Sequence, residues 1–313
     1  MEAAGAKSRI LTMFKKVLVL ADGDDPNQPA LRRALSCVDD AGEIDVFTAV
    51  YEPMLEGYLG NKQIYEPLRS RVVRERRERV AALARAAEGW GLKASGNAVW
   101  AHPLPRAVAD EVAARGIELV VAATAELHRG AAAPTGLSHS AWQLVTGCPV
   151  PVLVVKSDGQ AKYRSIVAAV DPFHAHAKPA ALDSEILRYA KAMQAATGAA
   201  LTALHCYAPL EYFGADLSQL LPADSHTATA RQEALHALCR EADVPTTAAR
   251  LVAGAPHLVL EKLQQGGEAD LIVMGALARG RLTELLIGST AERVLHHSRA
   301  DVLVIKPPVP AAP

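Results

Sequence analysis

The sequence has few cysteines. Four occur in 313 residues, they are widely separated, and no two form a CxxC pair. A disulfide framework or a structural zinc site needs paired or clustered cysteines. We therefore expect neither feature, and we expect the protein to reside in a reducing cytoplasm.

Long apolar runs are also missing. A membrane-spanning helix needs roughly 18 apolar residues, and the longest candidates, such as residues 271–278, are less than half that length. Lys15 and Lys16 precede an apolar run at residues 17–21, which is shorter than the roughly 7–15 residues of a secretory signal. We expect no membrane span and no signal peptide, and Met13 is a candidate start, with residues 1–12 as an extension.

Neither sign of charge is in excess. The chain has 33 Lys and Arg against 34 Asp and Glu, and half of its residues are hydrophobic although 4% are aromatic. A nucleic-acid-binding protein would show a basic surplus, and a disordered chain would combine high net charge with low hydrophobicity. We therefore expect a globular protein without a nucleic-acid partner, and the length suits about two domains.

The second half of the chain repeats the first. The apolar run VLVLAD at residues 17–22 corresponds to IVAAVD at 166–171, and both runs end in aspartate. Two further pairs of apolar runs match, so that the three offsets are 149, 152 and 150 residues. A constant offset near half the length predicts two copies of one domain. We place them at residues 13–157 and 162–307, joined by a polar linker.

Short apolar runs alternate with helical patterns in each copy. The runs are continuous in Val, Ile, Leu and Ala, which indicates parallel strands buried on both faces. We predict strands near residues 16–21, 44–50, 95–100, 117–123, 150–155, 165–170, 200–206, 247–253, 269–274 and 301–305. We predict helices near residues 28–41, 64–89, 104–115, 138–146, 180–197, 225–242, 256–265 and 289–297.

This alternation predicts the α/β class, with a doubly wound parallel sheet in each copy. Ligands of such sheets bind at the carboxyl ends of the strands, where the strand order reverses. Asp22 and Asp171 end the first strand of each copy and therefore lie where such a crevice would open.

Residues 274–290 are the segment best suited to bind a ligand. Gly275 follows a buried strand and would allow the backbone to approach a ligand closely. Gly288, Ser289 and Thr290 open the last helix, whose free N–H groups form an anion site. Ser289 and Glu292 also fit the capping-box pattern, which explains both without any ligand.

These features together resemble a tandem universal stress protein, most closely the UspE-like branch of that family. The resemblance extends to residues 28–34, to Val99 and Trp100, and to residues 290–294. It implies a five-stranded parallel sheet of order 3-2-1-4-5 in each copy. It also implies a non-catalytic stress-response protein whose two copies pair as an intramolecular pseudo-dimer. The sequence leaves open whether two copies of the whole chain form a homodimer.

Nucleotide-binding members of this family carry the motif G-x2-G-x9-G-[ST]. The second copy matches three of its four elements, and Ala278 replaces the second glycine. The resemblance therefore implies ATP or another adenine nucleotide, with Mg²⁺ present only together with it. It places Val170 and Asp171 at the base and ribose and Cys206 beside the adenine. Pocket walls and phosphate contacts would come from Met274, Gly275, Leu277, Gly288, Ser289 and Thr290.

The first copy departs further from this motif. The stretch from Ala122 to Ser138 lacks the first glycine, and no Gly-Ser pair opens the following helix. The acidic run DGDD at residues 22–25 would repel phosphates. We therefore expect this copy to be structural.

Several alternatives remain open. Long apolar loops at residues 51–65 and 207–222 would line a pocket for a lipid-like ligand, or they would pack the two copies together. An ATP hydrolase is a weaker alternative, because Glu284 and Glu292 lack a motif that fixes them.

Other polar residues have simpler explanations. His174 and His176 lack visible partners for a metal site, and His205 is expected to be a hydrogen-bonded core histidine. An arginine-rich helix is expected to be a solvated face with internal ion pairs. Its arginines are Arg69, Arg71, Arg74, Arg76, Arg77, Arg79 and Arg85.

Overall fold

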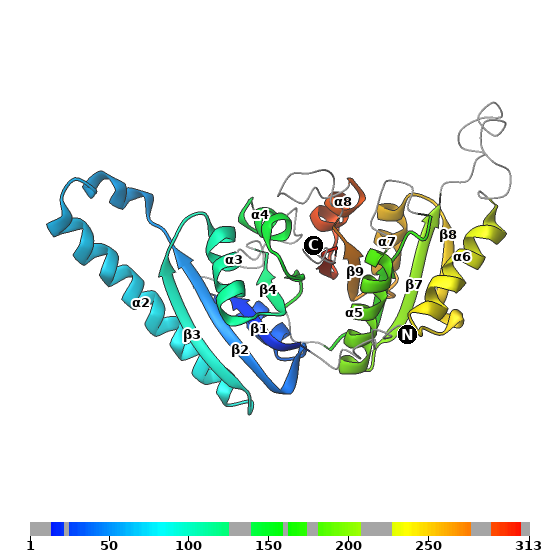
Figure 1. Ribbon diagram of the computed structural model, residues 1–313, viewed down its shortest axis with the longest axis horizontal. Helices are drawn as coiled ribbons and strands as arrows, with labels where there is room; N and C mark the ends of the chain where they lie inside the picture. The colour runs from blue at the N-terminus through cyan, green and yellow to red at the C-terminus, as the bar shows by residue number, and fades with distance from the viewer. Residues whose placement is uncertain are drawn as a thin grey trace, which may run out of the picture.

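The computed structural model describes residues 14–21, 25–124, 139–158, 162–173, 181–207, 227–276 and 289–307. Strands and helices alternate in both halves of the chain (Figure 1). The first half contains β1 (Phe14–Leu20), α1 (Pro29–Ala34), β2 (Val38–Val50), the 3-10 helix η1 (Pro53–Tyr58), α2 (Lys62–Glu88), β3 (Lys93–Trp100), α3 (Leu104–Arg115), β4 (Leu119–Ala123), α4 (His139–Gly147) and β5 (Val152–Val155). The second half contains β6 (Ser165–Ala169), α5 (Ala181–Thr197), β7 (Ala200–Tyr207), α6 (Ala228–Glu241), the 3-10 helix η5 (Thr246–Ala248), β8 (Ala249–Ala253), α7 (Pro256–Gln265), β9 (Leu271–Gly275), α8 (Ser289–His297) and β10 (Asp301–Ile305).

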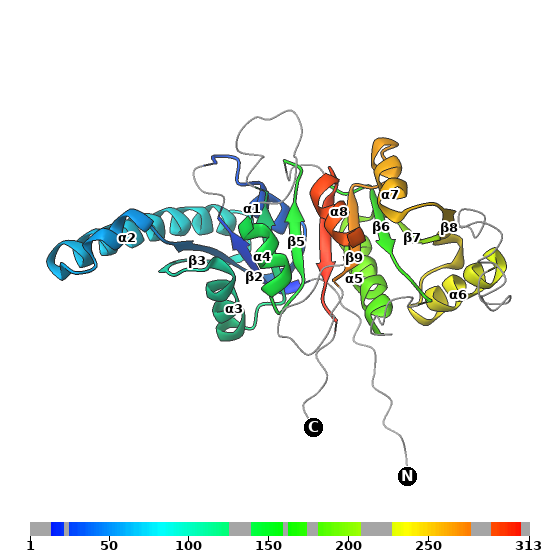
Figure 2. The same ribbon diagram turned by 90° about the horizontal axis from the view of Figure 1, so that it is seen from above.

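The strands form one ten-stranded sheet with the order β3-β2-β1-β4-β5-β10-β9-β6-β7-β8. Each half therefore has the order 3-2-1-4-5, with parallel neighbours. The two halves meet where β5 pairs with β10 in antiparallel orientation, and Figure 2 shows these strands side by side at the centre of the molecule. The predicted α/β class is confirmed, and the two expected sheets are joined into one.

Helices cover both faces of this sheet. Neighbouring residues of a strand point to opposite faces, so that Val17 and Val19 pack against α1 and α2, whereas Leu18 and Leu20 pack in the core beneath α3 and α4. In the second half, α5 and α6 cover the first face, and α7 and α8 cover the second. This burial on both faces explains why the strand sequences are continuous apolar runs.

Two lysines form equivalent hydrogen bonds between the two halves. Lys156 follows β5, and its Nζ donates a hydrogen bond to the carbonyl of Leu295 in α8. Lys306, which follows β10, donates in the same way to the carbonyl of Val145 in α4. Both lysines are buried. Each half therefore satisfies a helix carbonyl of the other half.

The helix predicted at residues 28–41 is wrong beyond Ala34. The Cys37 N–H donates to the Ala34 carbonyl, and the chain then enters β2, where Val38 pairs with Phe14. Asp39 accepts a hydrogen bond from the Ala41 N–H. Short acidic side chains compete for backbone hydrogen bonds in this way, which disfavours a helix.

The loop at residues 51–65 does not join the two halves, so that part of the expectation is wrong. It forms η1 and the start of α2, at the β3 end of the sheet and far from the β5–β10 junction (Figure 2). Met54 is 85% exposed and Leu59 is 54% exposed. Residues 208–222 of the second loop lie outside the described residues. Among the helices that the structure describes, none combines the length and apolar character needed to cross a membrane.

Candidate functional site

Asp171 follows β6 at the carboxyl edge of the sheet. The preceding residue, Val170, is buried, and its N–H donates to the Leu204 carbonyl. The Asp171 N–H donates to Asp183 Oδ1 at 3.1 Å, and Asp171 Oδ1 accepts from the Phe173 N–H at 3.3 Å. The Asp171 side chain is 38% exposed. Its carboxylate is therefore held by the local backbone and remains accessible to a ligand.

Asp183 anchors this turn from α5 and was not predicted from the sequence. It is fully buried, and it shares the buried face of α5 with Ile186, Leu187 and Ala190. An acidic residue in an apolar stripe of helical spacing is the signal that identifies it. Because a buried carboxylate is costly unless it is hydrogen-bonded, its contact with the Asp171 N–H fixes the end of β6.

His205 lies beside this turn. It is 3% exposed, and its Nδ1 is 3.2 Å from the Val170 carbonyl oxygen and 3.9 Å from Asp171 Oδ1. Burial lowers the pKa of His205 below its ordinary value, because a charged imidazole would lose its solvation. The prediction of a hydrogen-bonded core histidine is confirmed.

Arg231 reaches the same edge from the first turn of α6. Its Nη1 lies 3.4 Å from His205 Nε2, and its guanidinium lies 4.8 Å from the Phe173 ring centroid and 5.5 Å from that of Tyr207. Thr227 caps this helix by accepting a hydrogen bond from the Ala230 N–H. Sequence reasoning missed Arg231, because nothing in its helix sequence indicates which strand ends it approaches.

Cys206 and Met274 contribute apolar surface at the strand ends. Cys206 is half-buried near the end of β7, and Met274 is 5% exposed near the end of β9. Burial raises the pKa of the Cys206 thiol to about 12. A thiol with a raised pKa is a poor nucleophile, so Cys206 offers packing rather than reactivity.

Gly275 is required by packing within the protein. A Cβ at this position would lie 2.7 Å from Leu182 Cδ2 and 2.9 Å from Leu182 Cγ, both on α5. The sequence suggested a close approach to a ligand, and the structure supplies a close approach to a helix. The close packing against Leu182 therefore explains a glycine at position 275 without any ligand.

The remaining predicted site residues lie around α8. Ser289 is its first residue and is exposed, and Thr290 is half-buried. Leu277, Ala278 and Gly288 lie outside the described residues, as do His174 and His176. Within the described ranges, no group of three or more His, Cys, Asp or Glu side chains is arranged to hold a metal ion.

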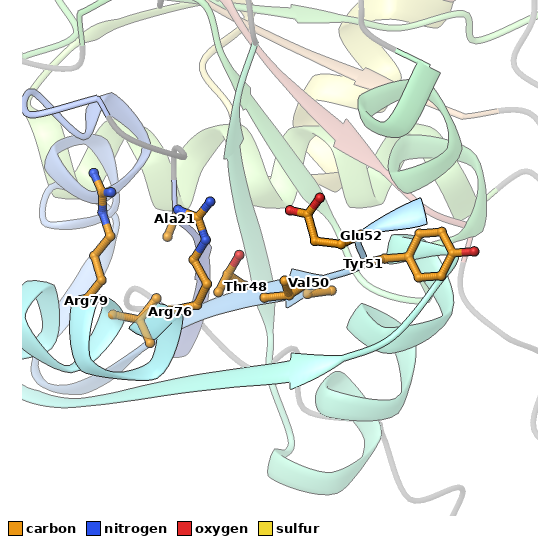
Figure 3. A pocket seen from close by; sticks show the side chains of 9 residues that line it. Ala21, Thr48, Val50, Tyr51, Glu52, Arg76 and Arg79 are labelled. Atoms are coloured by element: carbon orange, nitrogen blue, oxygen red, sulfur yellow. The ribbon is translucent and has the colours of Figure 1, made fainter. Parts of the chain in front are cut away.

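The first half has a cavity at the equivalent place. The Ala21 N–H donates to the Phe47 carbonyl, just as the Val170 N–H donates to Leu204, so that Thr48 corresponds to His205. A cavity of about 190 Å³ is lined by Ala21, by residues 48–52, and by Arg76, Arg79 and Val80 of α2 (Figure 3). The expectation that this copy is structural rested on its motif and did not foresee this cavity, which we call the first-half cavity.

Comparisons with known proteins agree with this architecture. The sequence profile of the Universal stress protein family matches residues 13–156 and 162–306. Universal stress protein E of Escherichia coli K12 is 26% identical over 306 residues, which cover 95% of each chain. The homologue from Photorhabdus laumondii is 27% identical over 304 residues, which cover 94% of this chain and 95% of that protein.

Solved structures show the same fold. A functionally unknown protein from Pseudomonas aeruginosa PAO1 has a TM-score of 0.69 at 22% identity, covering 96% of this chain and 95% of that one. A universal stress protein from Archaeoglobus fulgidus has a TM-score of 0.61 at 20% identity, covering 93% and 98%. Because the family profile matches both halves separately, the chain belongs to the universal stress protein family, with two such domains in tandem.

Proposed function

We propose that this universal stress protein binds an adenine nucleotide in its second domain, at the carboxyl ends of β6, β7 and β9, and catalyses no reaction on it. The observation that carries the proposal is the accessible Asp171 carboxylate, held by its own backbone and by Asp183. It stands where the strand order reverses, since β6 lies between β9 and β7. Open α/β sheets bind ligands at this place.

The residues at this edge suit an adenosine group. A carboxylate is an acceptor for two neighbouring hydroxyl groups, so Asp171 would hold the ribose. Val170, Cys206 and Met274 offer apolar surface to the base. The guanidinium of Arg231 and the ring of Phe173 add flat faces of the kind on which bases stack.

The phosphates would lie at the start of α8. This helix begins at Ser289, which is exposed. The first turn of a helix has unpaired N–H groups and the positive end of the helix dipole, and both favour anions. Gly288, Ser289 and Thr290 would therefore contact the phosphates, and Leu277 would complete the pocket wall.

Mass spectrometry of the small molecules released on denaturing the freshly purified protein tests this proposal. We expect stoichiometric ATP, ADP or AMP from the wild-type protein and little from the Gly288→Val variant, whose larger side chain would obstruct the phosphate site. Gly57→Val is the matched control, because a Cβ at Gly57 meets nothing within 4 Å. Equal nucleotide content in the wild-type protein and Gly288→Val would refute the assignment of these residues.

A scaffold that binds an apolar or lipid-like ligand is the second candidate. It is favoured by the exposed side chains of η1, of the residue that follows it and of the start of α2, which are Met54, Tyr58, Leu59 and Ile64. Large apolar side chains grouped on a surface mark interaction sites. Recovery of a fatty species in place of a nucleotide, and its loss in Leu59→Ser, would favour this candidate over the first.

A further inference from the structure

The two domains differ at equivalent strand ends. In the second domain, the buried His205 follows Leu204 and is in contact with Arg231. In the first domain, the smaller Thr48 follows Phe47 and lines the first-half cavity. The nucleotide motif is degenerate in the first domain, yet this domain has an open space at its strand ends. A ligand of the first-half cavity would therefore be recognised by residues other than that motif.

The cationic groups of the first-half cavity come from one face of α2. Arg76 and Arg79 are half-buried and line the cavity together with the buried Val80. Arg71, Arg74 and Arg77 of the same helix are exposed. Figure 3 shows the side chains of Arg76 and Arg79 extending from α2 in the same direction, with that of Arg76 close to Ala21 after β1. Arg76 and Arg79 are therefore less solvated than the rest of the expected arginine face.

We propose that the first-half cavity binds a small organic anion, with Arg76 and Arg79 holding its acidic group and the apolar walls holding a ring-sized body. A guanidinium matches the geometry of carboxylate and phosphate groups, with which it forms paired charge-assisted hydrogen bonds. A cavity of about 150 Å³ accommodates benzene, so the 190 Å³ here accommodates a six-membered ring. Val50 and Val80 supply apolar contacts, and the Thr48 hydroxyl supplies a hydrogen bond.

The charges around the cavity are of both signs, and the acidic run at residues 22–25 directly follows the lining residue Ala21. Glu52 is the opposing acidic group in the lining, and it is exposed, so that solvent screens its repulsion. Arg76 and Arg79 also interact with the protein itself. A guanidinium has five N–H donors, which allows it to keep such a contact while it binds an anion. The lining itself presents two cations and one exposed carboxylate, so the two arginines must outweigh the neighbouring acidic run for an anion to bind.

Isothermal titration of the full-length protein with benzoate and with phenyl phosphate tests the proposal, and uncharged benzamide is the ligand control. We expect at least one of the two anions to bind and benzamide to bind at least tenfold more weakly. Stronger binding of benzoate would identify a carboxylate as the ligand group, and stronger binding of phenyl phosphate would identify a phosphate ester. The Arg76→Met/Arg79→Met variant keeps the apolar stems, and we expect it to weaken anion binding at least tenfold.

Two matched variants make the test specific. Arg74→Met removes an exposed arginine of the same helix and should leave the affinity unchanged. Glu52→Gln removes the opposing charge and should strengthen anion binding about twofold. The proposal is overturned if neither anion binds at millimolar concentrations, if benzamide binds as well as the better-binding anion, or if Arg74→Met weakens binding as much as the double variant. Because only first-domain residues are changed, loss of binding in the double variant assigns the anion to the first-half cavity and not to the proposed nucleotide site.

Discussion

The Arg33 guanidinium lies 2.8 Å from the Asp301 carboxylate, measured from Nε to Oδ2, and the two residues belong to different domains. Their side chains are 3% and 0% exposed. The Tyr163 hydroxyl donates to the same carboxylate at 2.7 Å, and the Arg33 guanidinium lies 4.0 Å from the Tyr163 ring centroid. The backbone N–H groups of Lys156 and Ser157 donate to Asp301 as well. The domain junction is therefore built on a buried, hydrogen-bonded charge pair.

Removing one partner of this pair should destabilise the protein strongly. Asp301→Ala leaves the buried Arg33 without its counter-ion, and such a loss costs about 3–5 kcal/mol of unfolding free energy. Glu268→Ala breaks the exposed pair with Arg250 and should cost less than about 1 kcal/mol. Urea unfolding of both variants checks the comparison. Similar losses in the two variants would contradict the role of the junction.

The buried Lys306 should make stability depend on pH in the alkaline range. Burial lowers its pKa to about 8, against the ordinary lysine value of 10.5 in the unfolded chain. Between these values the unfolded state binds more protons, so the contribution of Lys306 to stability rises with pH by up to about 3 kcal/mol. Comparing the wild-type protein with Lys306→Met between pH 8 and 10.5 isolates this contribution, because the buried cysteines are common to both. A constant difference between the two proteins over that range would refute it.

His205 should make the protein less stable in mild acid. Its pKa is lowered by burial, so below about pH 6.5 the unfolded chain accepts a proton that the folded chain resists. The free energy of unfolding should therefore fall as the pH drops from about 6.5. We expect His205→Asn, which can still donate to the Val170 carbonyl, to lose stability less steeply with falling pH. Thermal unfolding at several pH values measures this slope, and an identical slope in the variant would argue against the assignment.

Replacing Gly275 by alanine should destabilise the protein unless the facing side chain on α5 is made smaller. Gly275→Ala brings a methyl group to about 2.7 Å from Leu182, and overpacking of this kind costs about 1–3 kcal/mol. Shortening Leu182 to alanine removes the clash, so the double variant should be more stable than the sum of the two single changes implies. A double-mutant cycle of unfolding free energies measures this coupling. Strictly additive effects would show that Gly275 is retained for another reason.

Much of the fold could be predicted because both faces of the sheet are buried. Continuous apolar runs such as residues 17–21 and 301–305 identify the strands, and the repeat at a constant offset identifies the two domains. The start of β2 could not be predicted. Its register with β1 shifts between Phe14 and Lys16, and the acidic residues in this part of β2 do not form a continuous apolar run.

The candidate site could be predicted in part. Asp171 stood out because it ends an apolar strand, and its position at the sheet edge follows directly. Arg231 and the cavity formed with Arg76 did not stand out, because their roles depend on how a helix is rotated over the sheet. Asp183 was in principle visible as a charged residue in the apolar stripe of α5.

The most direct test of the proposed function compares the two aspartates that end equivalent strand sequences. ATP affinity is measured by isothermal titration for the wild-type protein, for Asp171→Ala and for Asp22→Ala. We expect Asp171→Ala to weaken binding at least tenfold, because it removes the acceptor for the ribose, and we expect Asp22→Ala to bind ATP like the wild-type protein. Loss of binding in Asp22→Ala with full binding in Asp171→Ala, or no ATP binding by the wild-type protein, would contradict a nucleotide site in the second domain.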